Sequence, residues 1–370
     1  MSCDLFSLAT PGVAGLQPYH PGKPIEELQR ELGLDEIIKL ASNENPLGPS
    51  QKVLAAIAAT KDLSRYPDGN GFNLKKALAE KHDIETDRIT LGNGSNDILE
   101  MVARAFVNTE HQVIYSQHSF AVYPIVTQAV GAEHVVVPAY KWGHDLPAML
   151  AAVTDKTRLM FIANPNNPTG TWIRRESLRH LLENIPEHVI VLVDEAYFEY
   201  AASEEDYPDS SLCLDDFSNL IVTRTFSKAY GLAGLRVGYG LSNPAVANLL
   251  NRVRQPFNNN SLALVAAETA LQDEKYIERS VSVNQSGMQS LIKAFDKLGL
   301  EFIPSKGNFI CVDFKQPTDG LYQSLLKAGV IVRPVANYGM PNHLRVSIGT
   351  EPENLRFINE LAKIVTTQKC

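Results

Sequence analysis

The chain has few cysteines, and their spacing fits neither disulfide staples nor a metal site. Cys3, Cys213, Cys311 and Cys370 lie far apart among 370 residues, with no Cys-x-x-Cys pair and no histidine at zinc-ligand spacing. We therefore expect reduced thiols, no bound metal and a reducing compartment, the cytoplasm. The N-terminus lacks the basic start and apolar run of a signal peptide, and no apolar segment is long enough to cross a bilayer.

Positive charge is also scarce. The net charge is -8 and no Lys/Arg-rich cluster occurs, so we expect neither nucleic-acid nor membrane-surface binding. Hydrophobic residues make up 44% and charged residues 21%, which excludes a disordered chain. Because 370 residues exceed the size of one core, we expect a large domain and a smaller one. From the pattern along the chain we expect an N-terminal arm that joins the small domain (1–48), a large α/β domain (49–279) and a small C-terminal α+β domain (280–370).

One stretch, Thr223 to Gly240, carries the residues we expect to do the chemistry. A strand-like lead-in brings Thr225, Ser227 and Lys228 to a turn, and Arg236 returns on a second strand-like run. Two hydroxyls and a guanidinium suit a phosphate, and the Lys228 amine can condense with an aldehyde to a Schiff base. A solvated surface lysine is the ordinary alternative.

A glycine-rich turn follows the first strand of the predicted large domain. Gly94, Ser95 and Asn96 stand where an amphipathic helix begins, so their backbone N–H groups and the helix dipole would bind an anion. Asp97 occupies the third glycine position of a dinucleotide fingerprint, and no Gly-Lys-Ser/Thr follows. The turn therefore suits a single phosphate.

Polar and aromatic side chains stand at the ends of other predicted strands. Asp194 ends a continuous apolar strand, where it either faces a cation or caps a helix, and Tyr197 can reach the same ligand. Asn167 lies in a loop with two prolines and a glycine, from which it can donate to a ligand oxygen. Phe120 is a candidate to stack on a ring, with core packing as the alternative.

The two ends of the chain supply candidates for substrate binding. Arg333 and Arg345 each lie within an apolar strand pattern, which indicates a clamp for a carboxylate or phosphate, or else structural ion pairs. Tyr19 and Asn43 could line a substrate entrance, although turn hydrogen bonds would also explain Asn43. Tyr66 lies in an exposed loop, from which it could reach a ligand or another subunit, or simply pack within the loop.

Four motifs in chain order resemble those of the fold-type I pyridoxal-phosphate aminotransferases. They are Gly92-Asn-Gly-Ser-Asn-Asp97, Asn164-Pro-Asn-Asn-Pro-Thr-Gly170, Asp194-Glu-Ala-Tyr197 and Ser227-Lys-Ala-Tyr-Gly-Leu-Ala-Gly-Leu-Arg236. The block ending in Asn43-Glu-Asn-Pro-Leu-Gly48, the Arg65-Tyr-Pro-Asp68 turn and the tail with Arg345 are most similar to the histidinol-phosphate aminotransferases. The resemblance extends over nearly the whole chain. It implies an α/β fold with a mostly parallel seven-stranded sheet flanked by helices in the large domain, and a homodimer.

The resemblance also implies roles around pyridoxal 5'-phosphate. Lys228 would form the Schiff base with the cofactor and move a proton between Cα of the substrate and C4′ of the cofactor. Asp194 would keep the pyridine nitrogen protonated, Tyr197 and Asn167 would bond the 3′ oxygen, and Phe120 would stack on the ring. The phosphate would be held by Gly94, Ser95, Asn96, Thr225, Ser227, Arg236 and, from the neighbouring subunit, Tyr66.

The implied activity is transfer of an amino group between L-histidinol phosphate and 2-oxoglutarate by a ping-pong mechanism, in histidine biosynthesis. Arg345 would bind the substrate anion, Arg333 the phosphate of histidinol phosphate, and Tyr19 would lie near the imidazole, with Asn43 beside the substrate. Phe120 stands where some members have tyrosine, so a hydroxyl is lost there. The aromatic residue of the segment 337–340 favours an alternative, an aromatic amino-acid aminotransferase.

Two other readings stay open. A threonine-phosphate decarboxylase would share the fold and release carbon dioxide without consuming a keto acid. A cofactor-binding regulator without turnover would need a DNA-reading segment, for which the chain has neither spare length nor a basic face.

Overall fold

A seven-stranded sheet organises the larger part of the computed structural model, which describes residues 4–19 and 21–368. The strand order is β2-β8-β7-β6-β5-β3-β4, and only β8 runs against the others. The prediction of a mostly parallel seven-stranded sheet is confirmed. The strands are β2 (Ile89–Gly92), β3 (Gln112–Ser116), β4 (Glu133–Val137), β5 (Thr157–Ala163), β6 (Ile190–Asp194), β7 (Leu220–Thr225) and β8 (Gly238–Ser242).

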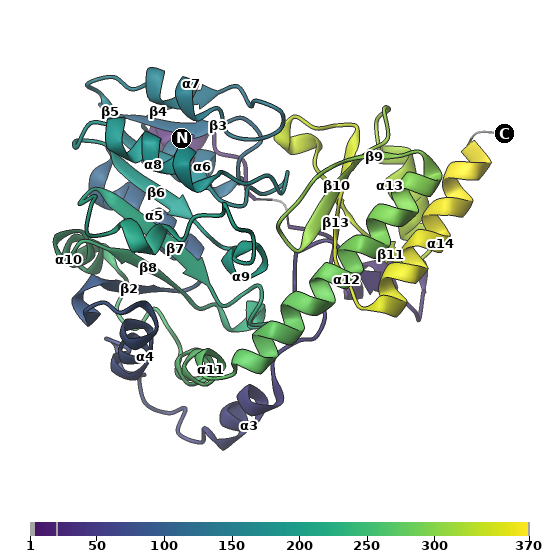
Figure 1. Ribbon diagram of the computed structural model, residues 1–370, viewed down its shortest axis with the longest axis horizontal. Coiled ribbons are helices and arrows are strands. Elements are labelled where there is room, and N and C mark those ends of the chain that lie inside the picture. Colours follow the sequence, from purple (N-terminus) through teal and green to yellow (C-terminus); the bar gives the residue numbers. More distant parts are fainter. Residues whose placement is uncertain (1–3, 20, 369–370) are drawn as a thin grey trace.

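Helices cover both faces of this sheet, as Figure 1 shows. One hydrophobic cluster joins α8 and α11 to one face, and a second joins α5, α6 and α10 to the other. This explains why the central strands are continuous apolar runs, since neither face meets water. The helices are α3 (Gln51–Ala59), α4 (Phe72–His82), α5 (Ser95–Phe106), α6 (Val122–Ala129), α7 (Leu146–Ala151), α8 (Arg175–Asn184), α9 (Phe198–Ala201), α10 (Pro244–Val253) and α11 (Ser261–Leu271).

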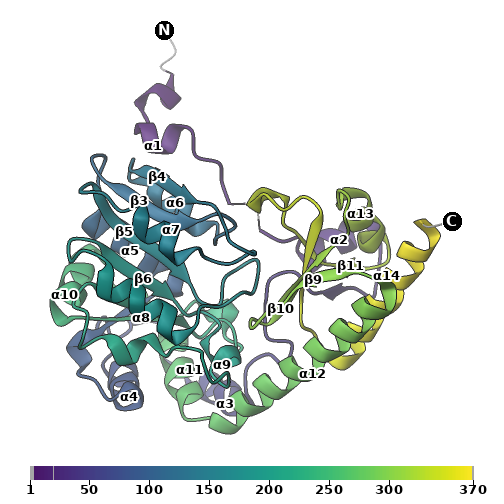
Figure 2. The ribbon, with the colours of Figure 1, turned by 45° about the horizontal axis from the view of Figure 1, so that its top comes forward.

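A four-stranded antiparallel sheet forms the small domain, in the order β12-β13-β10-β9. The N-terminal segment joins it, because β1 (Ile38–Lys39) pairs in parallel with β11 (Val330–Ile331). The long helix α12 (Glu274–Leu298) runs from the large domain into the small one (Figure 2). The remaining elements are α2 (Ile25–Leu32), β9 (Glu301–Ile303), β10 (Phe309–Asp313), α13 (Asp319–Lys327), β12 (Arg333–Pro334), β13 (His343–Ser347) and α14 (Glu351–Gln368).

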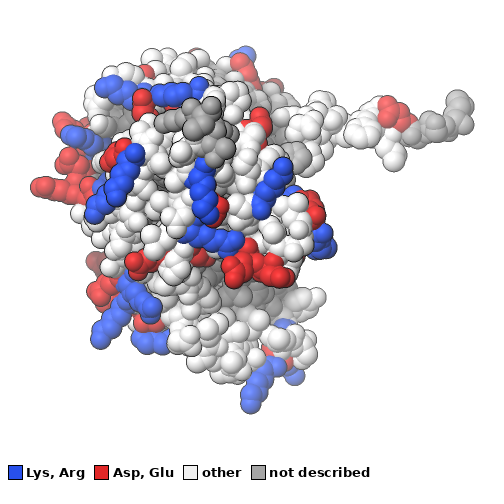
Figure 3. Space-filling model, turned by 90° about the vertical axis from the view of Figure 1, so that its right-hand side faces the viewer, with Lys and Arg blue, Asp and Glu red and all other residues white. Residues whose placement is uncertain are grey.

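The first described residues project from the body of the molecule (Figures 2 and 3). This arm contains the short helices η1 (Leu5–Leu8) and α1 (Pro11–Ala14). It leaves Leu5, Phe6 and Leu8 between 70% and 77% exposed, although all three are apolar. On the face drawn in Figure 3, acidic and basic side chains are intermixed.

Helix α4 begins after Gly71 and ends before Asp83, both in the left-handed conformation, and so lacks a Ser, Thr or Asn cap at its start. One local prediction is wrong. Arg236 lies on no strand. It follows the short helix η4 (Ala233–Leu235) in a left-handed conformation, with φ 56°, and β8 begins only at Gly238.

Further short helices are η2 (Thr86–Arg88), η3 (Ser210–Cys213) and η5 (Ala336–Tyr338). Within the described ranges, no helix is both long enough and apolar enough to cross a membrane. Cys213 and Cys311 are free thiols, whereas Cys3 and Cys370 lie outside the described residues.

Candidate active site

A cavity of about 260 Å³ opens where β5, β6 and β7 end and the small domain faces them. Ligands of open parallel sheets bind at this carboxyl edge. The cavity brings together most of the predicted site residues, from segments spread over more than 300 positions. Those that line it are Tyr19, Asn43, Ser95, Asn96, Phe120, Asn167, Asp194, Tyr197, Thr225, Ser227, Lys228, Arg236, Arg333 and Arg345.

Lys228 lies in the cavity wall, three residues beyond the end of β7. Its Nζ donates to the backbone oxygen of Ser42 at 3.3 Å, and no carboxylate of the described residues pairs with it. Burial, followed by the positive charge of Arg345, lowers the pKa of Lys228 from 10.5 to about 8. A substantial fraction of this amine is therefore neutral near physiological pH, as a nucleophile requires. The alternative of a solvated surface lysine is excluded.

The start of α5 and the turn after β7 together form an anion cradle. Ser95 is the first helical residue, and Arg236 approaches the same turn, where its Nη1 donates to Ser227 Oγ at 3.1 Å. A Cβ atom on Gly94 would lie 2.2 Å from Arg236 Nη2, and one on Gly238 would lie 2.4 Å from the backbone nitrogen of Ser95. Only glycine at both positions lets the guanidinium and the helix N-terminus come this close.

Asp194 is a buried carboxylate with hydroxyl partners. Its Oδ1 accepts from Thr223 and its Oδ2 from Tyr123, both at 3.1 Å. Burial raises the pKa of Asp194, because no cation pairs with it among the described residues. The expected cation is therefore not a protein side chain. A cationic ligand in the cavity would relieve the cost of this buried charge.

A chain of polar contacts joins the small domain to the loop after β5. Arg345 Nη1 donates to Asn167 Oδ1 at 2.5 Å, and its Nη2 donates to the backbone oxygen of Ala41 at 2.7 Å. Asn43 donates to the Tyr197 hydroxyl at 3.0 Å and accepts from Ser347 at 2.9 Å. Asn43 thus makes tertiary contacts beyond those of a turn.

Strand register brings the two predicted arginines side by side. Arg333 on β12 is the cross-strand partner of Arg345 on β13, and both line the cavity. The Arg333 guanidinium lies 6.0 Å from the ring centre of Tyr19, which is half exposed at the same opening. Two guanidinium groups at one opening favour a ligand with more than one negative charge.

Tyr66 lies away from the cavity within this chain. It is 81% exposed and stacks on Phe257, with ring centres 4.6 Å apart. The prediction that it completes the site from a neighbouring subunit is therefore not tested by a single chain.

Sequence reasoning missed Tyr123 and Thr223, which hold Asp194. Thr223 is its cross-strand neighbour on β7, a contact that only the register determines. Tyr123 lies one turn after Phe120 at the start of α6, and its ring stacks on Phe161 with centres 4.5 Å apart. The signal available was the short spacing of two aromatic residues at the start of one helix.

These residues fit pyridoxal phosphate. The anion cradle with Arg236 suits the phosphate of the cofactor, and the neutral amine of Lys228 suits its aldehyde. The buried carboxylate of Asp194 suits a protonated ring nitrogen. Phe120, beside the cavity, offers a flat face for its ring.

Fold and site together define a fold-type I pyridoxal-phosphate-dependent enzyme. Residues 35–361 match the family described as aminotransferase class I and II. Histidinol-phosphate aminotransferase 2 of Pseudomonas fluorescens Pf0-1 is 62% identical over 99% of both chains, and that of Pseudomonas aeruginosa is 58% identical over 98% of this chain and 99% of the other. The crystal structure of histidinol-phosphate aminotransferase from Sinorhizobium meliloti in complex with pyridoxal-5'-phosphate superposes with a TM-score of 0.90 at 30% identity, covering 99% of this chain and 100% of that one. The chain belongs to the class I and II aminotransferase family.

The depressed pKa of Lys228 predicts how the apoprotein takes up pyridoxal phosphate. Only the neutral amine attacks an aldehyde, so the association rate should rise with pH and reach half its maximum near pH 8. Stopped-flow absorbance measures this rate. Arg345→Gln removes a charge that lowers the pKa of Lys228, and should shift the midpoint to higher pH. A midpoint near 10.5, the ordinary value of lysine, would contradict the assignment.

Tyr123→Phe should lower kcat/KM about tenfold, because Asp194 loses one of the two hydroxyl groups that donate to its charged form. Loss of this bond also raises the pKa of Asp194, so the acidic limb of the pH–rate profile should move to higher pH. Tyr115→Phe is the matched control, since Tyr115 is also buried but bonds His134. Equal effects of the two substitutions on the pH profile would assign Tyr123 a packing role only.

Proposed function

We propose that the chain is a histidinol-phosphate aminotransferase of histidine biosynthesis. It uses pyridoxal 5'-phosphate to transfer an amino group between L-histidinol phosphate and 2-oxoglutarate. The observation that carries the proposal is the cross-strand pair of Arg333 and Arg345 at the mouth of the Lys228 cavity. The identity of 62% to a histidinol-phosphate aminotransferase over nearly the whole chain supports it.

The two arginines can bind the anionic groups of the substrates of both half-reactions. Histidinol phosphate carries a phosphate, and 2-oxoglutarate carries two carboxylates, so each substrate brings at least two negative charges to one opening. Arg345 is buried and held by Asn167 and Ala41, which fixes its direction. Arg333 lies further out, against the ring of Tyr19, which places a flat face beside an imidazole. Asn43 lines the same cavity, and we assign it to substrate binding.

When bound, pyridoxal phosphate supplies an electron sink for the electron pair released at Cα of the substrate. Lys228 is the base that takes and returns the proton at Cα, because its pKa of about 8 leaves a neutral amine available. Asp194 faces the cavity with a negative charge that favours a protonated ring nitrogen. Tyr197 and Asn167, which line the same cavity, would donate hydrogen bonds to the ring oxygen, and Phe120 would support the ring face.

We assign the phosphate of the cofactor to the cradle at the start of α5 and the turn after β7. The residues are Gly94, Ser95, Asn96, Thr225, Ser227 and Arg236, with Tyr66 from a second subunit. The amide nitrogens of the helix start and the guanidinium supply the positive charge that a phosphate dianion needs.

A homodimer is part of this proposal. Tyr66 is strongly exposed, and the projecting arm carries Leu5, Phe6 and Leu8 in exposed positions, which a second copy would cover. Analytical ultracentrifugation at micromolar concentration tests it, and a monomer that is fully active would refute the shared site.

We also propose the division into an arm (1–48), a cofactor-binding domain (49–279) and a small domain (280–370), which limited proteolysis would check. The cytoplasm is the compartment that the unpaired thiols Cys213 and Cys311 favour, and cell fractionation tests that assignment.

The alternative of an aromatic amino-acid aminotransferase rested on the segment 337–340. Its aromatic residue, Tyr338, is buried in a small cluster with Cys311 and Met340, and is not among the residues that line the cavity. No observation on the site favours this alternative, or a decarboxylase, over the transfer reaction.

The substrate assignment predicts a selective effect of Arg333→Gln. The KM for L-histidinol phosphate should rise about 10- to 100-fold, because a charge-assisted contact to phosphate is lost, while the KM for L-phenylalanine should change little. Arg252→Gln, an exposed arginine on α10, is the control. The half-reaction is followed by the cofactor absorbance. No absorbance change with histidinol phosphate, or faster turnover of phenylalanine, would overturn the substrate assignment, and release of carbon dioxide would indicate the decarboxylase.

A further inference from the structure

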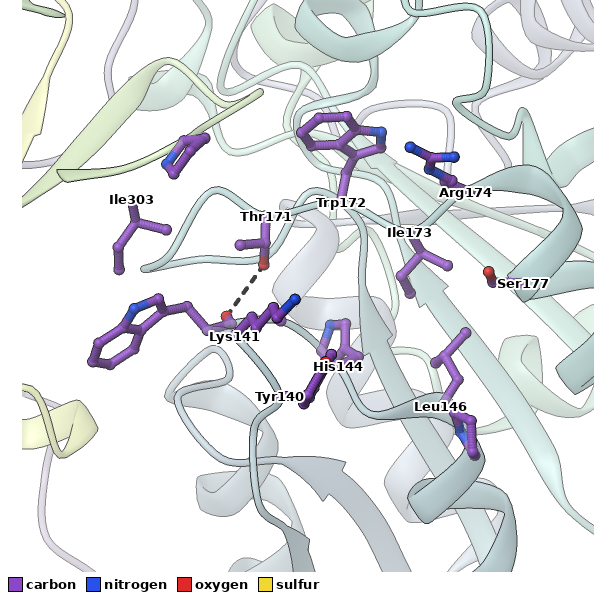
Figure 4. A pocket seen from close by; sticks show the side chains of 14 residues that line it. Tyr140, Lys141, His144, Leu146, Thr171, Trp172, Ile173, Arg174, Ser177 and Ile303 are labelled. Carbon is purple, nitrogen blue, oxygen red and sulfur yellow. Dashed lines mark hydrogen bonds between the residues drawn. The ribbon is translucent and has the colours of Figure 1, made fainter.

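A second and larger cavity, of about 630 Å³, lies outside the active site. Its walls come from the segment 140–147, from the segment 171–174 and Ser177, and from Ile303 and Pro304 of the small domain. Figure 4 shows the rings of Tyr140 and His144 on one side of it, and Trp172 with Arg174 on the other. None of its residues is used by the transfer reaction.

Aromatic side chains are concentrated here. The whole chain has two tryptophans, Trp142 and Trp172, and both line this cavity together with Tyr140. Trp142 contacts the rings of His118 and His343 but is still 38% exposed, and Tyr140 is 61% exposed, so part of each ring remains accessible. Flat exposed rings on several walls of one cavity favour a planar aromatic ligand.

The cavity also carries positive charge. Lys141 forms no ion pair with any described carboxylate, and its Nζ lies 5.2 Å from the ring centre of Tyr140. Arg174 faces the same space and is paired only loosely, at 3.7 Å, with Asp206, both side chains being well exposed. Asp145 is occupied as the cap of α7, where it accepts from the backbone of Ala148. An anionic group would therefore meet two available cations.

The turn that presents Lys141 and Trp142 is conformationally unfavourable for these residues. Tyr140 and Gly143 exchange two backbone hydrogen bonds, of 3.0 and 2.9 Å, so the two central residues form a tight hairpin turn. Both are left-handed, with φ 48° for Lys141 and 66° for Trp142, where Asn and Gly are normally preferred. Backbone strain of this kind is commonly retained where a side chain has a function.

Two buried polar atoms in the wall lack protein partners. His144 bonds the backbone oxygen of Ala163 through Nε2, at 2.8 Å, but its Nδ1 has no partner. Trp172 Nε1 also has none. Because unpaired buried polar groups are uncommon, they indicate that rearrangement or a bound molecule satisfies them.

We propose that this cavity binds a planar heteroaromatic ring that carries an anionic group, a molecule of about the size of a mononucleotide. The ring lies against Tyr140, Trp142 and Trp172, and the anion meets Lys141 and Arg174. Because Ile303 and Pro304 close one wall, the bound molecule touches both domains.

Adenosine 5'-monophosphate is the probe, added to the holoenzyme. Since both tryptophans line the cavity, intrinsic tryptophan fluorescence reports binding there without reference to turnover, and calorimetry supplies a second measure. We expect a saturable fluorescence change. Lys141→Gln should weaken binding about tenfold, whereas Lys76→Gln, at an exposed position of α4, should leave it unchanged. Adenosine and inorganic phosphate should each bind at least about tenfold more weakly than the nucleotide.

The strained turn gives an independent test. Lys141→Asn should raise the melting temperature, because Asn tolerates the left-handed conformation. The same substitution should lower the affinity for the nucleotide, because the positive charge is lost. The proposal fails if neither fluorescence nor calorimetry detects binding at millimolar nucleotide. It also fails if adenosine binds as tightly as the nucleotide. Binding that is lost in Arg345→Gln but kept in Lys141→Gln would place the nucleotide in the active site instead.

Discussion

Lys228→Ala should lower kcat/KM by at least about 10⁴-fold, because the substitution removes the only amine that the cavity holds among the described residues. Burial and the charge of Arg345 hold the pKa of this amine at about 8, so the loss removes a base suited to neutral pH. Steady-state kinetics with histidinol phosphate and 2-oxoglutarate measures the effect.

A small amine should restore part of the lost activity. Methylamine can enter the space that the lysine side chain leaves, and its neutral form can move the proton at Cα, so the rate should rise with methylamine concentration and with pH. Lys76→Ala, which removes an exposed lysine of α4, should behave as the wild type. Retention of the wild-type rate in Lys228→Ala would overturn the catalytic assignment.

Asp194→Asn should lower kcat by about 10²- to 10³-fold, the usual effect of removing a charge placed to stabilise the reacting centre. The carboxylate is buried and held by Tyr123 and Thr223, whose hydroxyls can rotate to meet an amide. The geometry should therefore persist while the negative charge is lost. KM should change less than kcat, since the proposed substrate contacts, Arg333 and Arg345, are unchanged.

The stability of Asp194→Asn should not follow its loss of kcat. Burial raises the pKa of Asp194, so the charged form costs free energy in the apoprotein and a neutral amide should not lower its melting temperature. Asp209→Asn is the contrasting control, because Asp209 pairs with Arg224 at 2.6 Å, and its loss should lower the melting temperature with little change in kcat. A melting temperature that falls as far in Asp194→Asn as in Asp209→Asn would assign Asp194 a structural role.

Local chemistry explains which features the sequence predicts well. Strand β6 is one apolar run that ends in Asp194. The glycines before α5 lie together in one short motif, and the hydroxyls around Lys228 lie together in another. Each motif therefore predicts its binding function from neighbouring residues alone. Helix α4 was missed because left-handed Gly71 and Asp83 bound it in place of the usual start signal.

Long-range geometry explains the rest. The turn of Arg236 depends on contact with Gly94, more than 100 residues earlier, and no local pattern predicts its left-handed backbone. Tyr123 reaches Asp194 only because α6 packs on the sheet beside β5. The meeting of Trp142 and Trp172 depends on the packing of two loops and the small domain.

The amino-acid sequence by itself determined the type of fold, the motif around Lys228 and the identity of most residues that line the cavity, because strand ends and glycine turns are encoded by neighbouring residues. The tertiary structure alone decided that Arg333 and Arg345 are cross-strand partners and that a second aromatic cavity exists. It also decided that hydroxyl groups contact Asp194 and that no basic side chain among the described residues pairs with it. The physical reason is that register and packing depend on contacts between residues far apart in the chain, which local patterns do not specify.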